Sequence, residues 1–277
     1  MSDTGQSGGA RGRRAEAPPR LDVEMVARGL AGTRARAQGL ILAGRVLVSG
    51  EIADKCGAPV RPNQSIEVLP GSRRFASRGG LKLDGAFEDL GLSAEGLVAL
   101  DVGASTGGFT DCLLRRGASR VYAADVGRGL LDDSLRRDPR VVVLEGVNFR
   151  YASPGLLPEK VSLATVDVSF ISLRHILPAL RPLLAPEALV VALVKPQFEA
   201  GRSKVGKGGV VRDDAARREA VRSVSEYAGS IGFAVAGEAE SRVRGPKGNR
   251  EVFLLLRWTG DAAAAAAPGV RRSPEGA

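Results

Sequence analysis

Four charged side chains stand where the ends of predicted strands would bring them together. Asp167 ends the apolar segment V-S-L-A-T-V-D, Lys195 ends L-V-V-A-L-V-K, and Glu251 begins E-V-F-L-L-L. Ligands of open α/β sheets bind at the carboxyl edge of the strands, and an antiparallel last strand would place its start at that edge. Lys82, in a helix predicted over 77–90, can join them there. A lysine that ends an apolar strand beside a cofactor site is costly unless it is used or paired, so we expect these four side chains to converge on one site.

A glycine-rich turn lies at the end of another predicted strand. Residues 97–110 read L-V-A-L-D-V-G-A-S-T-G-G-F-T, which predicts a strand, a tight turn and the start of a helix. This layout holds nucleotide-like cofactors in many α/β proteins. The turn does not match the dinucleotide pattern G-x-G-x-x-G, and it lacks the G-K-[ST] of a P-loop.

The turn resembles the first motif of class I methyltransferases, which use S-adenosylmethionine (SAM). Gly103 and Gly107 would let the backbone approach the methionine part, and Asp101 would order the turn and the water around the cationic tail. Asp125 ends the next strand, where an acidic residue grips a ribose, and Asn148 would face the adenine edge. The complete set of predicted cofactor contacts is Asp101, Gly103, Ala104, Ser105, Thr106, Gly107, Phe109, Asp125, Val126 and Asn148.

Strands and helices alternate regularly through the large second part of the chain. The apolar pattern predicts strands at 97–101, 121–125, 141–144, 161–167, 189–194, 231–236 and 251–256, and helices at 108–116, 128–137, 171–184 and 212–230. This spacing is typical of a mainly parallel sheet covered on both faces. The predicted fold class is therefore α/β, a Rossmann-like doubly wound domain over 77–259 with a seven-stranded sheet.

Residues 20–68 predict a small α+β domain of two helices and a short sheet. The G-L-A-x-[ST]-R step at residues 29–34 and the A-G-x-V-x-V-x-G hairpin at residues 43–50 resemble the RNA-binding domain named after ribosomal protein S4. The resemblance implies RNA phosphate contacts. The basic residues that we expect to make them are Arg20, Arg34, Arg36 and Arg45; a plain solvated face is the alternative.

The overall composition is that of an ordinary globular protein with a basic surplus. The 277 residues carry a formal net charge of +9, and residues 1–75 hold 12 Lys or Arg against 7 Asp or Glu. A polyanion partner is favoured. The two cysteines are far apart in sequence, so we expect neither a metal site nor a disulfide, and a cytoplasmic protein. Residues 1–19 and 260–277 are predicted to be disordered tails, and residues 69–76 a linker.

Two further features have ordinary explanations beside functional ones. The stretch between Pro196 and Val211 is rich in glycine and basic residues, which fits a mobile loop near RNA or a surface loop. His175 lies in an apolar predicted helix and is interpreted as a structural histidine.

The order Lys82, Asp167, Lys195 and Glu251 resembles the catalytic tetrad of FtsJ-like ribose 2′-O-methyltransferases. Together with S-R-G-x-x-K-L, D-V-G-x-G, D-x-S-F-I-S, L-V-K-P-Q-F-E and G-N-x-E, it is similar to the TlyA (hemolysin A) family. The resemblance implies methylation of a cytidine 2′-hydroxyl in ribosomal RNA, in 23S and also in 16S RNA for some members, with Lys195 as the base. It implies ribosomal RNA or ribosomal subunits as partners and no metal.

Three rival functions remain open. A non-catalytic RNA-binding protein would need a broken cofactor turn or tetrad. A pore-forming hemolysin would need a membrane-inserting segment, and no apolar run approaches the ~18 residues that span a bilayer. A base or protein acceptor is disfavoured, because base amino-group enzymes carry [DN]-P-P-[FYW] where this chain has D-V-S-F.

Overall fold

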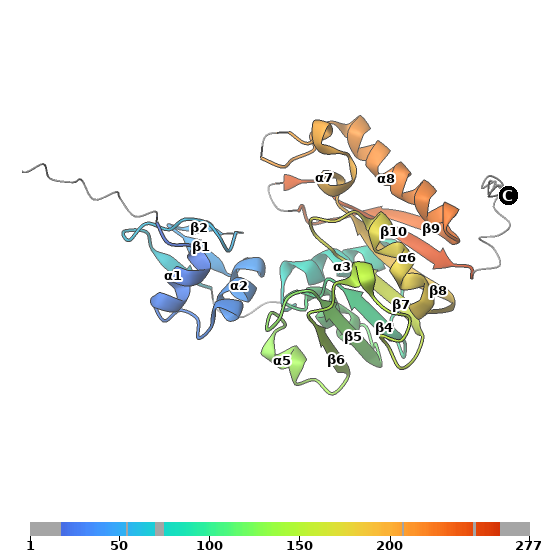
Figure 1. The fold of residues 1–277 in the computed structure, drawn as a ribbon, viewed down its shortest axis with the longest axis horizontal. Coiled ribbons are helices and arrows are strands. Elements are labelled where there is room, and N and C mark those ends of the chain that lie inside the picture. The colour runs from blue at the N-terminus through green and yellow to red at the C-terminus, as the bar shows by residue number, and fades with distance from the viewer. Residues whose placement is uncertain (1–17, 54, 70–74, 207, 246–247, 261–277) are drawn as a thin grey trace, which may run out of the picture.

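The computed structural model describes residues 18–53, 55–69, 75–206, 208–245 and 248–260. Most of the two predicted tails and of the linker therefore lies outside the described residues. Within them the chain forms a small N-terminal domain and a large α/β domain (Figure 1).

The N-terminal domain packs two short helices against a small antiparallel sheet. Its elements are α1 (Leu21–Ala27), α2 (Arg34–Leu42), β1 (Val46–Val48), β2 (Glu51–Ile52) and β3 (Ile66–Val68), with strand order β2-β1-β3. The Thr33 side chain accepts a hydrogen bond from Arg36 N and caps α2. Leu21, Met25 and Ile41 are fully buried between the layers. The predicted two-helix unit is present, with β2 as an addition.

The large domain is built on a seven-stranded sheet of order β6-β5-β4-β7-β8-β10-β9. The strands are β4 (Val98–Val102), β5 (Arg120–Asp125), β6 (Val141–Glu145), β7 (Val161–Val166), β8 (Leu184–Val194), β9 (Phe233–Glu240) and β10 (Val252–Trp258). Strands β4 to β8 run parallel, whereas β10 is antiparallel to both β8 and β9. The mainly parallel sheet with an antiparallel last strand is thus confirmed.

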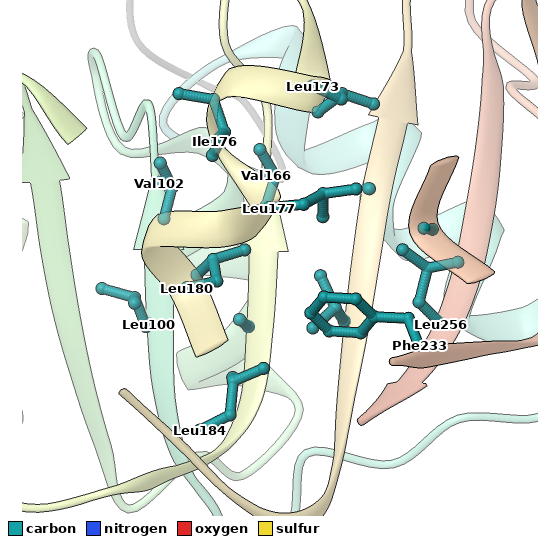
Figure 2. Packing of buried hydrophobic residues seen from close by; sticks show 14 of the residues in the cluster. Leu100, Val102, Val166, Leu173, Ile176, Leu177, Leu180, Leu184, Phe233 and Leu256 are labelled. Atoms are coloured by element: carbon teal, nitrogen blue, oxygen red, sulfur yellow. The ribbon is translucent and has the colours of Figure 1, made fainter. Parts of the chain in front are cut away.

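Helices cover both faces of the sheet (Figure 1). They are α3 (Arg78–Asp89), α4 (Gly108–Arg115), α5 (Asp133–Arg136), α6 (Leu177–Leu180), α7 (Pro196–Glu199) and α8 (Asp214–Ser230), with 3-10 turns η1 (Phe149–Tyr151), η2 (Leu173–His175), η3 (Arg181–Leu183) and η4 (Arg202–Lys204). One buried cluster joins the sheet to η2, α6 and α8; Figure 2 shows Leu177 and Leu180 of α6 among Leu100, Val102 and Val166 of the strands. A second cluster joins the opposite face to α3 and α4. Two cores sandwich the sheet and fix its carboxyl edge.

Two predicted helices were wrong in extent. The helix expected over 171–184 is split into η2, α6 and η3, because Pro178 and Pro182 lack the N–H that an uninterrupted helix needs. The helix expected over 128–137 is reduced to α5, and Gly129 has a positive φ of 66° that a helix does not accommodate. The short helix α7 was not predicted.

Candidate active site

The glycine-rich turn is organised by Asp101, a fully buried carboxylate at the end of β4. It accepts hydrogen bonds from Thr110 Oγ1 at 2.7 Å and from Thr165 Oγ1 at 3.1 Å. Burial raises the pKa of Asp101 to about 7, an effect that the negative charge of Asp167 reinforces and the two threonine hydrogen bonds oppose. Asp101 therefore joins β4, α4 and β7 beneath the turn, and the cavity described below is lined by other residues.

The two glycines of the turn have different reasons to lack a side chain. Gly103 has φ = 88°, and a Cβ there would lie 2.5 Å from the backbone oxygen of Asp167. Gly107 has φ = 92°, and a Cβ there would collide with Leu135 and lie 2.8 Å from Leu131 Cδ1. Gly103 lines the cavity, whereas Gly107 lies beside Leu131 and Leu135. Its role is to let the turn pack against the segment around α5.

Asp125 connects the turn to the loop after β5. Its Oδ2 accepts from Ser105 N at 2.8 Å, and its Oδ1 accepts from Gly127 N at 2.7 Å. Each carboxylate oxygen retains capacity for a second donor, so the side chain can order both loops and still accept from a hydroxyl. The neighbouring Val126 is 71% exposed. The exposed Asn148 accepts from Arg150 N at 3.3 Å and caps η1.

Lys82 and Glu251 form one buried ion pair of the predicted tetrad. Lys82 Nζ donates to Glu251 Oε2 at 2.6 Å, and Glu251 is fully buried. Lys82 lies on α3, whose N-terminus is capped by Ser77 through Gly79 N. The carboxylate faces Gly245, because a Cβ at that glycine would collide with Glu251 Oε1. Gly245, which has no side chain, therefore packs directly against the Glu251 carboxylate.

Lys195 and Asp167 form the second pair. Lys195 Nζ lies 2.6 Å from Asp167 Oδ1 and donates to Ser169 Oγ at 3.0 Å. Burial favours a raised pKa for Asp167, but the charges of Lys195 and Lys82 outweigh it, so the pKa lies below its ordinary value. Asp167 is therefore an anion that holds the Lys195 amine from one side while Ser169 holds it from another.

One cavity joins the turn to the tetrad. Its volume is about 170 Å³. The lining comprises Leu42, Ser77, Arg78, Gly79, Lys82, Gly103, Ala104, Ser105, Thr106, Gly108, Phe109, Asp167, Ser169 and Lys195. Thus three of the four predicted tetrad residues share a wall with the predicted cofactor turn, and Glu251 lies behind Lys82.

Phe170 is a candidate functional residue that the sequence patterns did not reveal. It is 91% exposed and has φ = 65°, a left-handed conformation that costs a bulky residue about 1–3 kcal/mol. It follows Ser169, and its ring packs 5.3 Å from that of Phe198 on α7. Strained residues of this kind cluster at ligand sites. The motif D-V-S-F-I-S carried the only hint in the sequence, and it does not reveal a backbone angle.

Two of the predicted RNA-binding arginines share a buried carboxylate. Arg20 donates to both oxygens of Asp22, at 3.0 and 3.1 Å, and Arg34 donates to Asp22 Oδ2 at 2.9 Å. Gln38 donates to the same oxygen at 2.7 Å. Burial favours a raised pKa for Asp22, but the three donors outweigh it and hold the pKa far below its ordinary value. Asp22 thus aligns two half-exposed guanidinium groups side by side.

The other two arginines face the linker and the large domain. Arg45 donates to the backbone oxygen of Leu69 at 2.9 Å, and Arg36 lies 3.7 Å from Asp132 Oδ2. Close by, a Cβ on Gly39 of α2 would lie 3.3 Å from the backbone oxygen of Leu130. Helix α2 therefore contacts the loop between β5 and α5, and Arg36 lies on the side of the N-terminal domain that faces this loop.

The loop after α7 is tied to the segment that precedes Glu251. The buried Asn249 accepts from Val211 N at 3.1 Å and donates to the backbone oxygen of Gly209 at 2.9 Å. His175 is exposed in η2 rather than packed in a helix.

Comparison with known proteins agrees with this geometry. Residues 75–258 match the FtsJ-like methyltransferase family and residues 19–66 match the S4 domain. The 16S/23S rRNA (cytidine-2′-O)-methyltransferase TlyA of Mycobacterium tuberculosis is 47% identical over 89% of this chain and 92% of its own length. Hemolysin A of Brachyspira hyodysenteriae is 40% identical over 84% of this chain and 97% of its own.

Solved structures include a hemolysin-named protein of Streptococcus thermophilus, 41% identical, with a TM-score of 0.67 over 91% of this chain and 94% of the other. The matched regions contain the glycine-rich turn, the four tetrad residues and the paired arginines. The chain therefore belongs to the TlyA (hemolysin A) family, whose members join an S4 domain to an FtsJ-like methyltransferase domain.

Proposed function

We propose that this protein transfers the methyl group of SAM to the ribose 2′-hydroxyl of a cytidine in ribosomal RNA. The observation that carries the proposal is the single cavity lined by both the turn at residues 103–106 and the side chains of Lys82, Asp167 and Lys195. A methyl donor held by the turn would lie beside the two lysines and the carboxylate that line the same cavity. The TlyA relatives, which carry this activity in their names, support the choice of acceptor.

The residues of the cavity fit SAM. Gly103 leaves the backbone of the turn free of a side chain, and the Asp125 carboxylate is ordered by two backbone donors at the end of β5. We assign the ten sequence-predicted contacts to SAM, with Asp101 and Gly107 acting through the shape of the turn. When bound, SAM supplies an electrophilic methyl group on sulfur.

The proton of the attacking hydroxyl goes to Lys195. In its unprotonated form Lys195 Nζ would take the proton of the attacking ribose hydroxyl, while bound SAM would supply the methyl group and its sulfur would keep the electron pair of the broken carbon–sulfur bond. Asp167 and Ser169 fix the position of that amine. Lys82 adds positive charge near the developing alkoxide, and Glu251 holds Lys82 in place. General-base catalysis of this kind contributes about 10²–10⁴ in rate.

Arginines of the N-terminal domain and Phe170 of the large domain would hold the RNA. Arg20 and Arg34, aligned by Asp22, offer guanidinium groups for backbone phosphates. Arg36 and Arg45, which lie near Asp132 and Leu69, are the other two arginines that we expect to contact RNA phosphates. The exposed ring of Phe170 offers a stacking surface for a base drawn out of its helix. We expect the protein to work in the cytoplasm, where ribosomal subunits are found.

The direct test is methylation of purified 30S and 50S subunits with labelled SAM, followed by mapping of ribose methylation. Label on a cytidine 2′-oxygen in 23S RNA, or in both RNAs, is the expected result. Label confined to a base, or none in either RNA, would reject the proposal. By name, the Mycobacterium tuberculosis relative is a 16S/23S rRNA methyltransferase, whereas a second TlyA relative, of Campylobacter jejuni, is a 23S rRNA methyltransferase.

A second function is suggested by the name of one relative, Hemolysin A. None of the helices within the described ranges is long and apolar enough to cross a membrane. Leakage of dye from liposomes, measured with pure protein at the concentrations used for methylation, tests pore formation separately.

A further inference from the structure

Glu199, the last residue of α7, binds the segment that carries Asp167. Its Oε2 accepts from Ser172 Oγ at 2.6 Å, and its Oε1 accepts from Leu173 N at 2.8 Å. These donors lie at the start of η2, where the first backbone N–H groups have no partner within the turn. The carboxylate thus caps η2 from a different element of the fold.

Two more contacts join the same segments. Lys195 donates to Ser169 at 3.0 Å, and the rings of Phe198 and Phe170 lie 5.3 Å apart. Residues 167–172, which we name the β7–η2 loop, therefore run alongside residues 195–199 with contacts at the beginning, middle and end. Glu199 supplies the contact at the end.

The β7–η2 loop has little support from the main chain. Asp167 N donates to the backbone oxygen of Val102, but within the described part of the chain no backbone N–H of residues 168–172 donates to another backbone oxygen. Yet Phe170 is held at φ = 65° with its ring exposed. A strained conformation persists only when the surroundings over-determine it, and here the side chains facing α7 must do so.

We propose that Glu199 is a positioning residue for methyl transfer. By fixing the start of η2, it keeps the β7–η2 loop in register with α7, so that Ser169 and Asp167 both hold Lys195 Nζ and Phe170 stays beside them. The proposal rests on the proposed function, because it assigns Glu199 a role in that reaction. Glu199 does not line the cavity, so it acts through these residues rather than on a substrate.

The test compares Glu199→Ala and Glu199→Gln with Glu226→Ala, a matched change at an exposed glutamate of α8. Two quantities are measured on the full chain: hydrogen exchange of residues 168–176, and steady-state methylation of ribosomal subunits across pH. For Glu199→Ala we expect exchange at Leu173 to be about tenfold faster and kcat to fall roughly 10–100-fold, since a small misplacement of a catalytic group costs that much. The KM for SAM should stay within about twofold and the pH profile of kcat should shift, because only the setting of Lys195 changes.

Glu199→Gln keeps one acceptor oxygen and the size of the side chain, so it should lie between Glu199→Ala and the unmodified protein. It also serves if Glu199→Ala fails to fold. Unchanged exchange at Leu173, or faster exchange with unchanged kcat and pH profile, overturns the proposal. If the unmodified protein methylates no RNA, the proposed function falls and so does the assigned role in it, whereas failure of the role alone leaves the unmodified protein active.

Discussion

Lys82 Nζ lies 2.6 Å from Glu251 Oε2, although the two residues are 169 positions apart in the chain. The pair joins α3, which precedes the first strand of the sheet, to the start of β10, its last strand in sequence. Both side chains are buried. The ion pair therefore closes the large domain from its first helix to its last strand while it contributes a lysine to the cavity.

Breaking this pair from one side should destabilise the large domain. Removal of one partner leaves a buried charge without compensation, so Lys82→Met or Glu251→Leu alone is expected to lower the free energy of unfolding by about 3–5 kcal/mol. In the double variant the free energy of unfolding should fall by less than the sum of the two single losses, because neither buried charge remains. Urea unfolding followed by circular dichroism measures all three.

The exposed pair Arg250–Glu240 is the control for that experiment. Glu240→Gln should change the free energy of unfolding by about 1 kcal/mol or less, since solvent screens the interaction. Additive losses for Lys82 and Glu251 would show that the two side chains act independently and would contradict the buried pair.

Lys195→Ala should abolish methyl transfer and leave SAM binding intact. The variant removes the proposed proton acceptor, and we expect kcat to fall by at least about 10²-fold. Labelled methyl transfer gives the rate, and calorimetric titration gives the SAM affinity. Lys160→Ala, at an exposed lysine before β7, should behave like the unmodified protein; full activity in Lys195→Ala would refute the assigned role.

The buried Asp101 makes stability fall as pH rises. Its folded pKa of about 7 lies above the ordinary value of 3.8, so between about pH 4 and pH 7 the folded protein binds a proton that the unfolded chain has released. The contribution of Asp101 to the free energy of unfolding is fully present below about pH 4. It falls by an amount on the order of 4 kcal/mol as the pH rises to 7.

Asp101→Asn removes this titration and one of two acceptor oxygens. We expect the difference in unfolding free energy between the variant and the unmodified protein to shift in favour of the variant from pH 5 to pH 8. The lowered pKa of Asp167 has the opposite sign and acts below about pH 4, outside that window. A difference that stays constant with pH would show that Asp101 does not titrate there.

Phe170→Gly should separate stability from activity. Glycine adopts φ = 65° without strain and the ring is almost fully exposed, so the thermal midpoint should hold or rise. Loss of the stacking surface should raise the KM for RNA and lower kcat/KM by roughly 10–100-fold, because stacking on an aromatic ring provides about 1–3 kcal/mol per base. A variant with unchanged kcat/KM would remove Phe170 from the RNA interface.

Arg20→Ala and Arg34→Ala should weaken RNA binding in a salt-dependent way. Each variant removes one phosphate contact, so the slope of log affinity against log salt should become shallower by about 1. Arg28→Ala is the matched control, since the Arg28 side chain is 27% exposed, against 50% for Arg20 and 55% for Arg34, and also donates to the backbone oxygen of Gln64. Filter binding over a salt series would measure the slopes, and equal slopes for all three variants would argue against the paired-arginine site.

Much of the site was predictable because strand ends are visible in the sequence. Asp167 and Lys195 terminate apolar runs, and Glu251 begins one, so a sheet with an antiparallel last strand had to bring them to one edge. Asp125 and the turn followed from the same logic. These are consequences of topology, which hydrophobic patterning encodes directly.

The features of the site that the sequence does not predict depend on tertiary contacts between side chains. The backbone angle of Phe170 and the capping of η2 by Glu199 arise from tertiary contacts that no local pattern records. The sharing of Asp22 by two arginines likewise required the packed helices. The division of the helix expected over 171–184 is different, because the sequence itself contains the two prolines that interrupt it.

The close approach of Gly103 to the backbone of Asp167 limits which residues this position can accept. A Cβ at Gly103 would lie 2.5 Å from the backbone oxygen of Asp167. This neighbour belongs to the main chain, so it cannot move aside as a flexible side chain could. The absence of a side chain at Gly103 lets the turn lie directly against the end of the strand that carries Asp167, and both residues line the cavity. A substitution here would have to move the turn or the backbone of Asp167, so the residue at this position sets how closely two walls of the cavity approach each other.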